Sequence, residues 1–160
     1  MMVGALGQLS ASGNQQGDFV KLRGNIRGSN TVWHNTSLPY LVTSDVSIFH
    51  YNYGQTTTLT IEPGVVVKFN TGTGLLVGNN LDGCNICYGA LNAIGTSTQP
   101  ILFTANTQNP TAGDWKGISF DSRTTTSTLD YVTVEYGGNT LNADVSIASS
   151  AVSMTNSTIR

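Results

Sequence analysis

One pattern of apolar and polar residues occurs twice, at a fixed interval, near the end of the 160-residue chain. Residues 129–135 read LDYVTVE and residues 154–160 read MTNSTIR, so that Leu129 matches Met154 (154 − 129 = 25) and Val134 matches Ile159 (159 − 134 = 25). A unit this short cannot bury its own apolar face, and it does so by stacking on a neighbouring copy. The interval therefore predicts successive turns of a solenoid.

Short apolar runs bounded by turn residues continue this pattern from residue 19 onward. Ile118 and Val145 repeat at 27 residues (145 − 118 = 27), and the Pro63-Gly64 pair predicts a corner between two strands. Turns of roughly 22 to 30 residues built from about three short strands are typical of a parallel β-helix. No segment has a sustained 3.6-residue apolar period, so little or no helix is expected. Residues 19–48 are expected to form the first coil.

Composition favours a folded β-protein and excludes two functional classes. Hydrophobic residues make up 39% of the chain and the net charge is −2, which is unlike a disordered segment. Seven basic residues against nine acidic ones, without a basic cluster, argue against a nucleic-acid partner. No apolar run approaches the length of about 18 residues that a membrane span needs. Residues 1–18 are expected to be an irregular leader, and residues 19–160 the β-helix.

The two cysteines lie close together in a Gly- and Asn-rich stretch. Cys84 and Cys87 form a CxxC pair, which is consistent with a disulfide that staples a loop, half of a zinc site, or a redox pair. His34 and His50 are far away and lack zinc-ligand spacing, and no βαβ unit accompanies the pair. We therefore favour a local disulfide or two inert thiols, and expect no metal.

Several of these segments resemble the repeats of right-handed parallel β-helix proteins of the pectin-lyase-like group. The resemblance lies in residues 59–69, 113–118, 129–138 and 155–159 and covers about residues 20 to 160. It implies an all-β, right-handed parallel β-helix of about five to six coils, in a group common among secreted and surface bacterial proteins. The group includes lyases, glycoside hydrolases, adhesins, phage tailspikes and scaffolds, so the resemblance says less about function than about fold.

The end of the sequence departs from a complete member of this group. Arg160 follows directly on a predicted strand, without a polar cap. An uncapped solenoid end exposes unpaired backbone and core. We therefore expect a truncated β-helix that self-associates through its open end.

The resemblance also suggests where a catalytic site would lie. Polysaccharide lyases of this fold hold calcium with clustered carboxylates and use an Arg or Lys as the base. The nearest approach to such a set is Asp114, Asp144 and Lys116, with Asp121 and Arg123 nearby. Alternatively, Asp114 caps a corner through its own backbone, as Asp often does in turns. The catalytic set is therefore the alternative, with calcium as its cofactor.

Aromatic residues provide a second candidate site. Trp115, Tyr131 and Tyr136, with Tyr51 and Tyr53 further upstream, would suit stacking against sugar rings, although aromatic residues at solenoid corners commonly cover loops. The 25-residue offset also pairs Glu135 with Arg160 as an opposite-charge contact between coils.

These observations favour a non-catalytic extracellular or surface module that acts as a structural, adhesive or carbohydrate-contacting scaffold. Polysaccharide is the expected partner. The alternative is a polysaccharide-active enzyme, a lyase or glycoside hydrolase, or a fragment of one.

Overall fold

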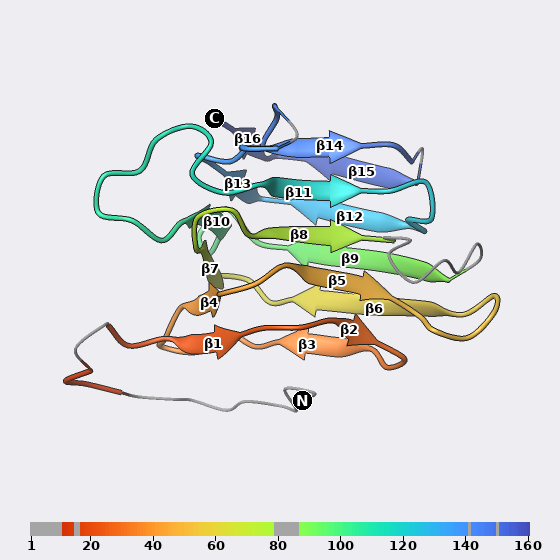
Figure 1. Ribbon diagram of the computed structural model, residues 1–160, viewed down its shortest axis with the longest axis horizontal. Coiled ribbons are helices and arrows are strands. Elements are labelled where there is room, and N and C mark those ends of the chain that lie inside the picture. Colours follow the sequence, from red (N-terminus) through yellow and green to blue (C-terminus); the bar gives the residue numbers. More distant parts are fainter. Residues whose placement is uncertain (1–10, 15–16, 79–86, 141, 150) are drawn as a thin grey trace.

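The protein is a right-handed parallel β-helix, in which three parallel sheets surround one core (Figure 1). This computed structural model describes residues 11–14, 17–78, 87–140, 142–149 and 151–160. Sheet A holds β1 (Val20–Leu22), β4 (Tyr40–Val42), β7 (Val66–Phe69), β10 (Ile101–Ala105), β13 (Val132–Val134) and β16 (Thr158–Ile159). Sheet B holds β2 (Ile26–Arg27), β5 (Val46–Phe49), β8 (Gly74–Val77), β11 (Gly117–Phe120) and β14 (Val145–Ile147). Sheet C holds β3 (Thr31–Trp33), β6 (Thr56–Ile61), β9 (Tyr88–Ile94), β12 (Ser127–Asp130) and β15 (Val152–Thr155).

Each coil contributes one strand to each sheet, in the order A, B, C. Figure 1 shows the coils rising from β1–β3 to β13–β15, with β16 beginning a sixth. The predicted intervals are confirmed, because Leu129 pairs with Met154, Val134 with Ile159 and Ile118 with Val145. The predicted fold class is therefore confirmed.

The first coil is shorter than the sequence suggested. Val20 pairs with Tyr40, an offset of 20 residues (40 − 20 = 20). Gly24 and Gly28 both have positive φ, at 85° and 79°, so the corners around β2 are tight. The prediction that residues 19–48 form one coil was therefore wrong, and β4 and β5 belong to the second coil.

The core consists of the inward-facing side chains of every second strand residue. In β6 the buried residues are Thr57, Leu59 and Ile61, which alternate with half-buried or exposed threonines. Aromatic side chains fill the wider part of the core, where the Phe69 ring stacks on Trp115 at 4.0 Å and lies 6.4 Å from the Phe103 ring. Such close packing fixes the register of the coils, because a slip of one residue would turn this apolar set to the solvent.

The described residues before β1 contain no strand. These are residues 11–14 and 17–19, whereas residues 1–10 and 15–16 of the expected leader lie outside the described part of the chain. Throughout the described ranges the regular elements are strands, and no helix there is long and apolar enough to cross a membrane.

Candidate functional site

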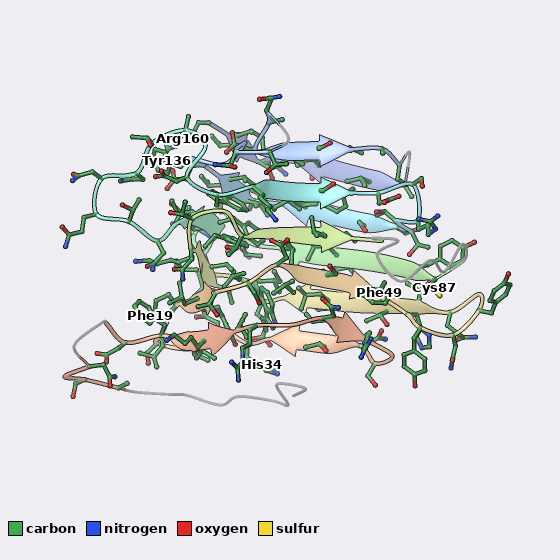
Figure 2. The ribbon with its side chains drawn as sticks, in the orientation of Figure 1. Phe19, His34, Phe49, Cys87, Tyr136 and Arg160 are labelled. Atoms are coloured by element: carbon green, nitrogen blue, oxygen red, sulfur yellow. The ribbon has the colours of Figure 1, made fainter. Side chains whose placement is uncertain are left out.

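A groove with a volume of about 780 Å³ lies on the outer face of sheet A. We call it the sheet-A groove. Its lining residues come from the first four coils and are Phe19, Lys21, Arg23, Leu41, Thr43, Asn70 and Asn106. Figure 2 places Phe19 beside β1, on the opposite side of the molecule from Cys87.

The alternation of the strands turns the polar residues into this groove. Leu22, Tyr40 and Val42 belong to the core, so their neighbours Lys21 and Leu41 lie on the outer face. Lys21 pairs with Leu41, and Leu41 pairs with Lys68 on the next strand. Leu41 is only 4% exposed, yet it lies outside the core cluster. It therefore forms a buried apolar floor on the outer face of the sheet.

An amide pair forms the polar part of the floor. The Asn106 side-chain nitrogen donates a 3.0 Å hydrogen bond to the Asn70 side-chain oxygen. The Asn70 amide nitrogen and the Asn106 amide oxygen make no hydrogen bond within the described part of the chain. The Thr43 hydroxyl donates to the Leu22 carbonyl at 3.1 Å. The floor thus offers one donor and one acceptor, at positions fixed by neighbouring strands.

The groove is electropositive although the chain is acidic. Neither Lys21 nor Arg23 forms an ion pair with any residue that the structure describes. Nearby carboxylates on the sheet-A side are already paired: Asp45 with Lys116 at 2.6 Å and Glu135 with Arg160 at 2.9 Å. The groove therefore carries uncompensated positive charge.

The three candidate catalytic residues do not converge on one point. Both carboxylate oxygens of Asp114 accept hydrogen bonds from Thr111, one from its backbone N–H at 2.8 Å and one from its hydroxyl at 3.1 Å. One oxygen of Asp144 accepts the Gly137 backbone N–H at 2.5 Å. Asp144 lies beside Gly117, because Ile118 pairs with Val145, and not beside Asp114. Each carboxylate thus holds its own turn, which is the corner-capping role that the sequence left open for Asp114.

Lys116 pairs with a carboxylate that the sequence analysis did not consider. Its ammonium contacts Asp45, whose other oxygen accepts the Gly74 backbone N–H at 3.0 Å. A Cβ at Gly74 would lie 2.9 Å from the Lys116 Cβ, so glycine leaves the space that the lysine occupies. The interval of 71 residues between Asp45 and Lys116 gives no sequence signal of this pair.

The described residues do not fit the calcium site that the enzymatic alternative requires. No group of three or more Asp, Glu, His or Cys side chains within the described ranges is arranged to hold a metal. Calcium takes six to eight oxygen ligands, and Asp114 and Asp144 direct theirs to separate backbone groups.

The aromatic candidates fall into three different environments. Trp115 is fully buried, stacks on Phe69 and donates its indole N–H to the Glu135 carbonyl at 2.9 Å. Its position corrects the expectation of a sugar-stacking surface there, because neither face of the indole is open to solvent. Tyr131 and Tyr136 are half-buried, and Tyr136 packs against the core. Tyr51 and Tyr53 are 61% and 77% exposed on the loop between β5 and β6.

Cys87 is buried, with 1% of its surface exposed. Cys84 lies outside the described residues, so the predicted disulfide between the two stays a prediction.

The last strands expose apolar side chains at inward-facing positions. Ile147 and Ile159 are 48% and 43% exposed, whereas their partners Phe120 and Val134 are fully buried. Self-association through this end stays a prediction, and light scattering over a dilution series tests it.

The sequence analysis missed the sheet-A groove because its residues are scattered between positions 19 and 106. The alternation in residues 20–26 and 65–69 does turn Lys21 and Lys68 outward. However, the offset between successive coils varies, so the columns could not be aligned from the sequence.

Comparison with protein families identifies the fold family of this chain. A model of the pectate-lyase-like β-helix domain matches residues 25–148. Searches of curated proteins and of solved structures found no match. The matched span covers most of the chain and includes strands of all three sheets. The chain therefore belongs to the pectate-lyase-like β-helix domain family.

Proposed function

We propose that this β-helix is a non-catalytic extracellular or cell-surface module that contacts polysaccharide through the sheet-A groove. The single observation that carries the proposal is this groove, which combines an apolar floor, an amide pair and unpaired cations on rigid strands. Ligand sites typically have volumes of about 300–1,000 Å³ and place a few polar groups on a largely apolar lining.

The chemistry of the lining suits a sugar chain. Sugar hydroxyls both donate and accept hydrogen bonds, and the unused amide groups of Asn70 and Asn106 offer one of each. Phe19 adds an aromatic side chain. Its ring packs against the backbone of Gly17, because a Cβ at Gly17 would lie 2.7 Å from the ring. The aromatic side chain is thus held in place before a ligand binds.

The contacts of Asp114, Lys116 and Asp144 favour a binding role over a catalytic one. Each of these residues already holds a neighbouring turn or a charged partner. A general acid or base needs to reach the reacting group of the substrate within hydrogen-bond distance. These residues would have to break their present contacts to act on a glycosidic bond.

A binding assay with product analysis tests the proposal. We expect oligosaccharides to bind without the release of reducing or unsaturated ends, and Asn106→Ala to weaken that binding. Asn92→Ala is the matched control, because Asn92 lies on β9 in sheet C, away from the groove. Product formation would support the enzymatic alternative. The absence of any glycan binding would leave a purely structural rod.

A further inference from the structure

Two lysines lie in one outward-facing column of sheet A, two strands apart. Lys21 on β1 pairs with Leu41 on β4, and Leu41 pairs with Lys68 on β7. Neighbouring strands are separated by about 4.8 Å, so the two lysine positions are about 9.6 Å apart along the solenoid axis. The column is therefore a pair of cations at a defined spacing, with an apolar side chain between them.

The surroundings leave this positive charge uncompensated. Neither lysine forms an ion pair with the described residues, and Arg23 adds a third cation at the rim. The carboxylate further along the same column, Glu135, is held by Thr104 and Arg160. Asp18, adjacent to Phe19, accepts a hydrogen bond from Asn14. An anionic ligand would thus meet three free cations at this face.

The shape of the surface continues past Lys68. A second hollow of about 260 Å³ borders the same lysine and is lined by Thr36, Ser37, Leu38, Pro39, Gly64, Val66 and Lys68. The apolar side chains Leu38, Pro39 and Val66 lie there, as Leu41 does in the sheet-A groove. The face therefore alternates cationic and apolar positions in the direction in which the coils stack.

We infer that the ligand of this face is an extended polyanionic glycan that runs along the solenoid axis and places successive anionic groups at Lys21 and Lys68. This inference rests on the proposed function and adds the charge class and the orientation of the ligand. The lysines and Arg23 bind carboxylate or sulfate groups through charge-assisted hydrogen bonds. Leu41 packs against the apolar part of the sugar ring that lies between two anionic groups.

Isothermal titration of the whole chain at low salt tests the inference. The probes are an oligouronate, the same oligomer with its carboxyl groups reduced to alcohols, a sulfated glycan and single-stranded DNA. We expect the oligouronate or the sulfated glycan to bind at least tenfold more tightly than the reduced oligomer. Added salt should remove most of this difference, because screening shortens the reach of exposed charges.

Variants then locate the site. Lys21→Gln and Lys68→Gln should each weaken binding of the anionic probe about fivefold, the loss expected for one exposed charge contact. Lys21→Arg and Lys68→Arg keep the charge and should restore the affinity. Arg27→Gln is the matched control, because Arg27 is exposed on β2 in sheet B.

Different results separate the failure of the inference from the failure of the proposed function. Equal binding of the oligouronate and its reduced form would overturn the inference and leave the polysaccharide-binding proposal intact. An equal loss in Arg27→Gln would show attraction by overall charge and overturn the site. Tighter binding of DNA than of either anionic glycan would overturn the glycan assignment. No binding of any glycan would overturn the proposed function as well.

Discussion

Glu135 is a nearly buried carboxylate that connects three strands of sheet A. It is 8% exposed, and one oxygen accepts the Thr104 hydroxyl at 2.9 Å. The other oxygen accepts two hydrogen bonds from the Arg160 guanidinium, at 3.0 and 2.9 Å. The sequence predicted the pairing with Arg160 from the 25-residue offset, and the structure confirms it. The contact with Thr104 was not predicted.

Removing the two partners of this ion pair should have unequal effects. Glu135→Ala leaves the buried Thr104 hydroxyl without its acceptor and should lower the free energy of unfolding by about 1–3 kcal/mol. Arg160→Ala removes a side chain that is 68% exposed and should cost less than about 1 kcal/mol. Urea unfolding followed by circular dichroism measures both values. Equal losses would show that the ion pair, and not the contact with Thr104, carries the stabilisation.

Tyr131 adopts a backbone conformation that non-glycine residues seldom take. Its φ is 49°, and Asn156, which follows it by one 25-residue coil, has a φ of 47°. Asparagine tolerates this left-handed region better than other residues with a side chain. Tyr131→Val should therefore be about 1–2 kcal/mol less stable than Tyr131→Asn, which removes the same ring. The two variants are compared by urea unfolding, and equal stabilities would contradict backbone strain at this position.

At the scale of elements, the corner after β3 is joined to the corner after β6 through Glu62. One carboxylate oxygen of Glu62 accepts the Asn35 backbone N–H at 2.8 Å, and the other lies 2.8 Å from the His34 ring nitrogen. The hydrogen bond from the Asn35 backbone, followed by that from His34, lowers the pKa of Glu62 below its ordinary value of 4.5. The contact joins the first two coils at the corner between sheets C and A.

The lowered pKa fixes the direction of the pH dependence. A carboxyl group with a lower pKa in the folded state stabilises the fold above about pH 4.5, and this contribution is lost as the pH falls through the lowered value. Wild-type protein should therefore lose stability between pH 5 and 3, a window set by that pKa, more steeply than Glu62→Gln does. Urea unfolding at several pH values measures the two slopes. Parallel slopes would rule out Glu62 as the group that titrates.

The tightest backbone contact between elements is at Gly89 in β9. A Cβ there would lie 2.0 Å from the Ile48 carbonyl oxygen and 2.7 Å from the Gly78 nitrogen, both of which are backbone atoms. Gly89→Ala should therefore cost about 3 kcal/mol or more, since the strands must move apart. Gly72→Ala is the control: a Cβ at Gly72 meets no atom within 4 Å, and only its positive φ of 72° opposes the change. Its cost should be about 1 kcal/mol, and equal costs in urea unfolding would contradict the close approach.

The elements that the sequence predicts best are those whose spacing stays constant between coils. The 25- and 27-residue intervals give the correct register for β12–β15 and for β11–β14 because no insertion falls between those strands. The offset changes elsewhere, from 20 residues between β1 and β4 (40 − 20) to 36 between β7 and β10 (105 − 69). The sheet-A groove lies where the offsets change, so its lining could not be aligned. Trp115 was misjudged because a tryptophan beside a turn has the same sequence context whether it points into the core or out of it.

At the scale of the whole molecule, the coils share one core but have unequal neighbours. Each central strand pairs with a strand on both sides, whereas β1 pairs only with β4 and β16 only with β13. Leu59, Leu91 and Phe103 in the central coils are fully buried. By contrast, both residues of β16 are exposed and none of β15 is buried.

This gradient predicts that the solenoid opens from its ends. Each coil of a solenoid is stabilised mainly by its nearest neighbours, so the coils with one neighbour open at the lower free energy. Amide hydrogen exchange should be slowest in β6, β9 and β10 and should quicken stepwise toward β1 and β16. Glu135→Ala should speed exchange in β13 and β16 and leave β6 unchanged, because Glu135 contacts only the later coils. Uniform protection across all coils would mean that the core unfolds as one cooperative unit, and a change in β6 would mean that the loss of one contact reaches beyond neighbouring coils.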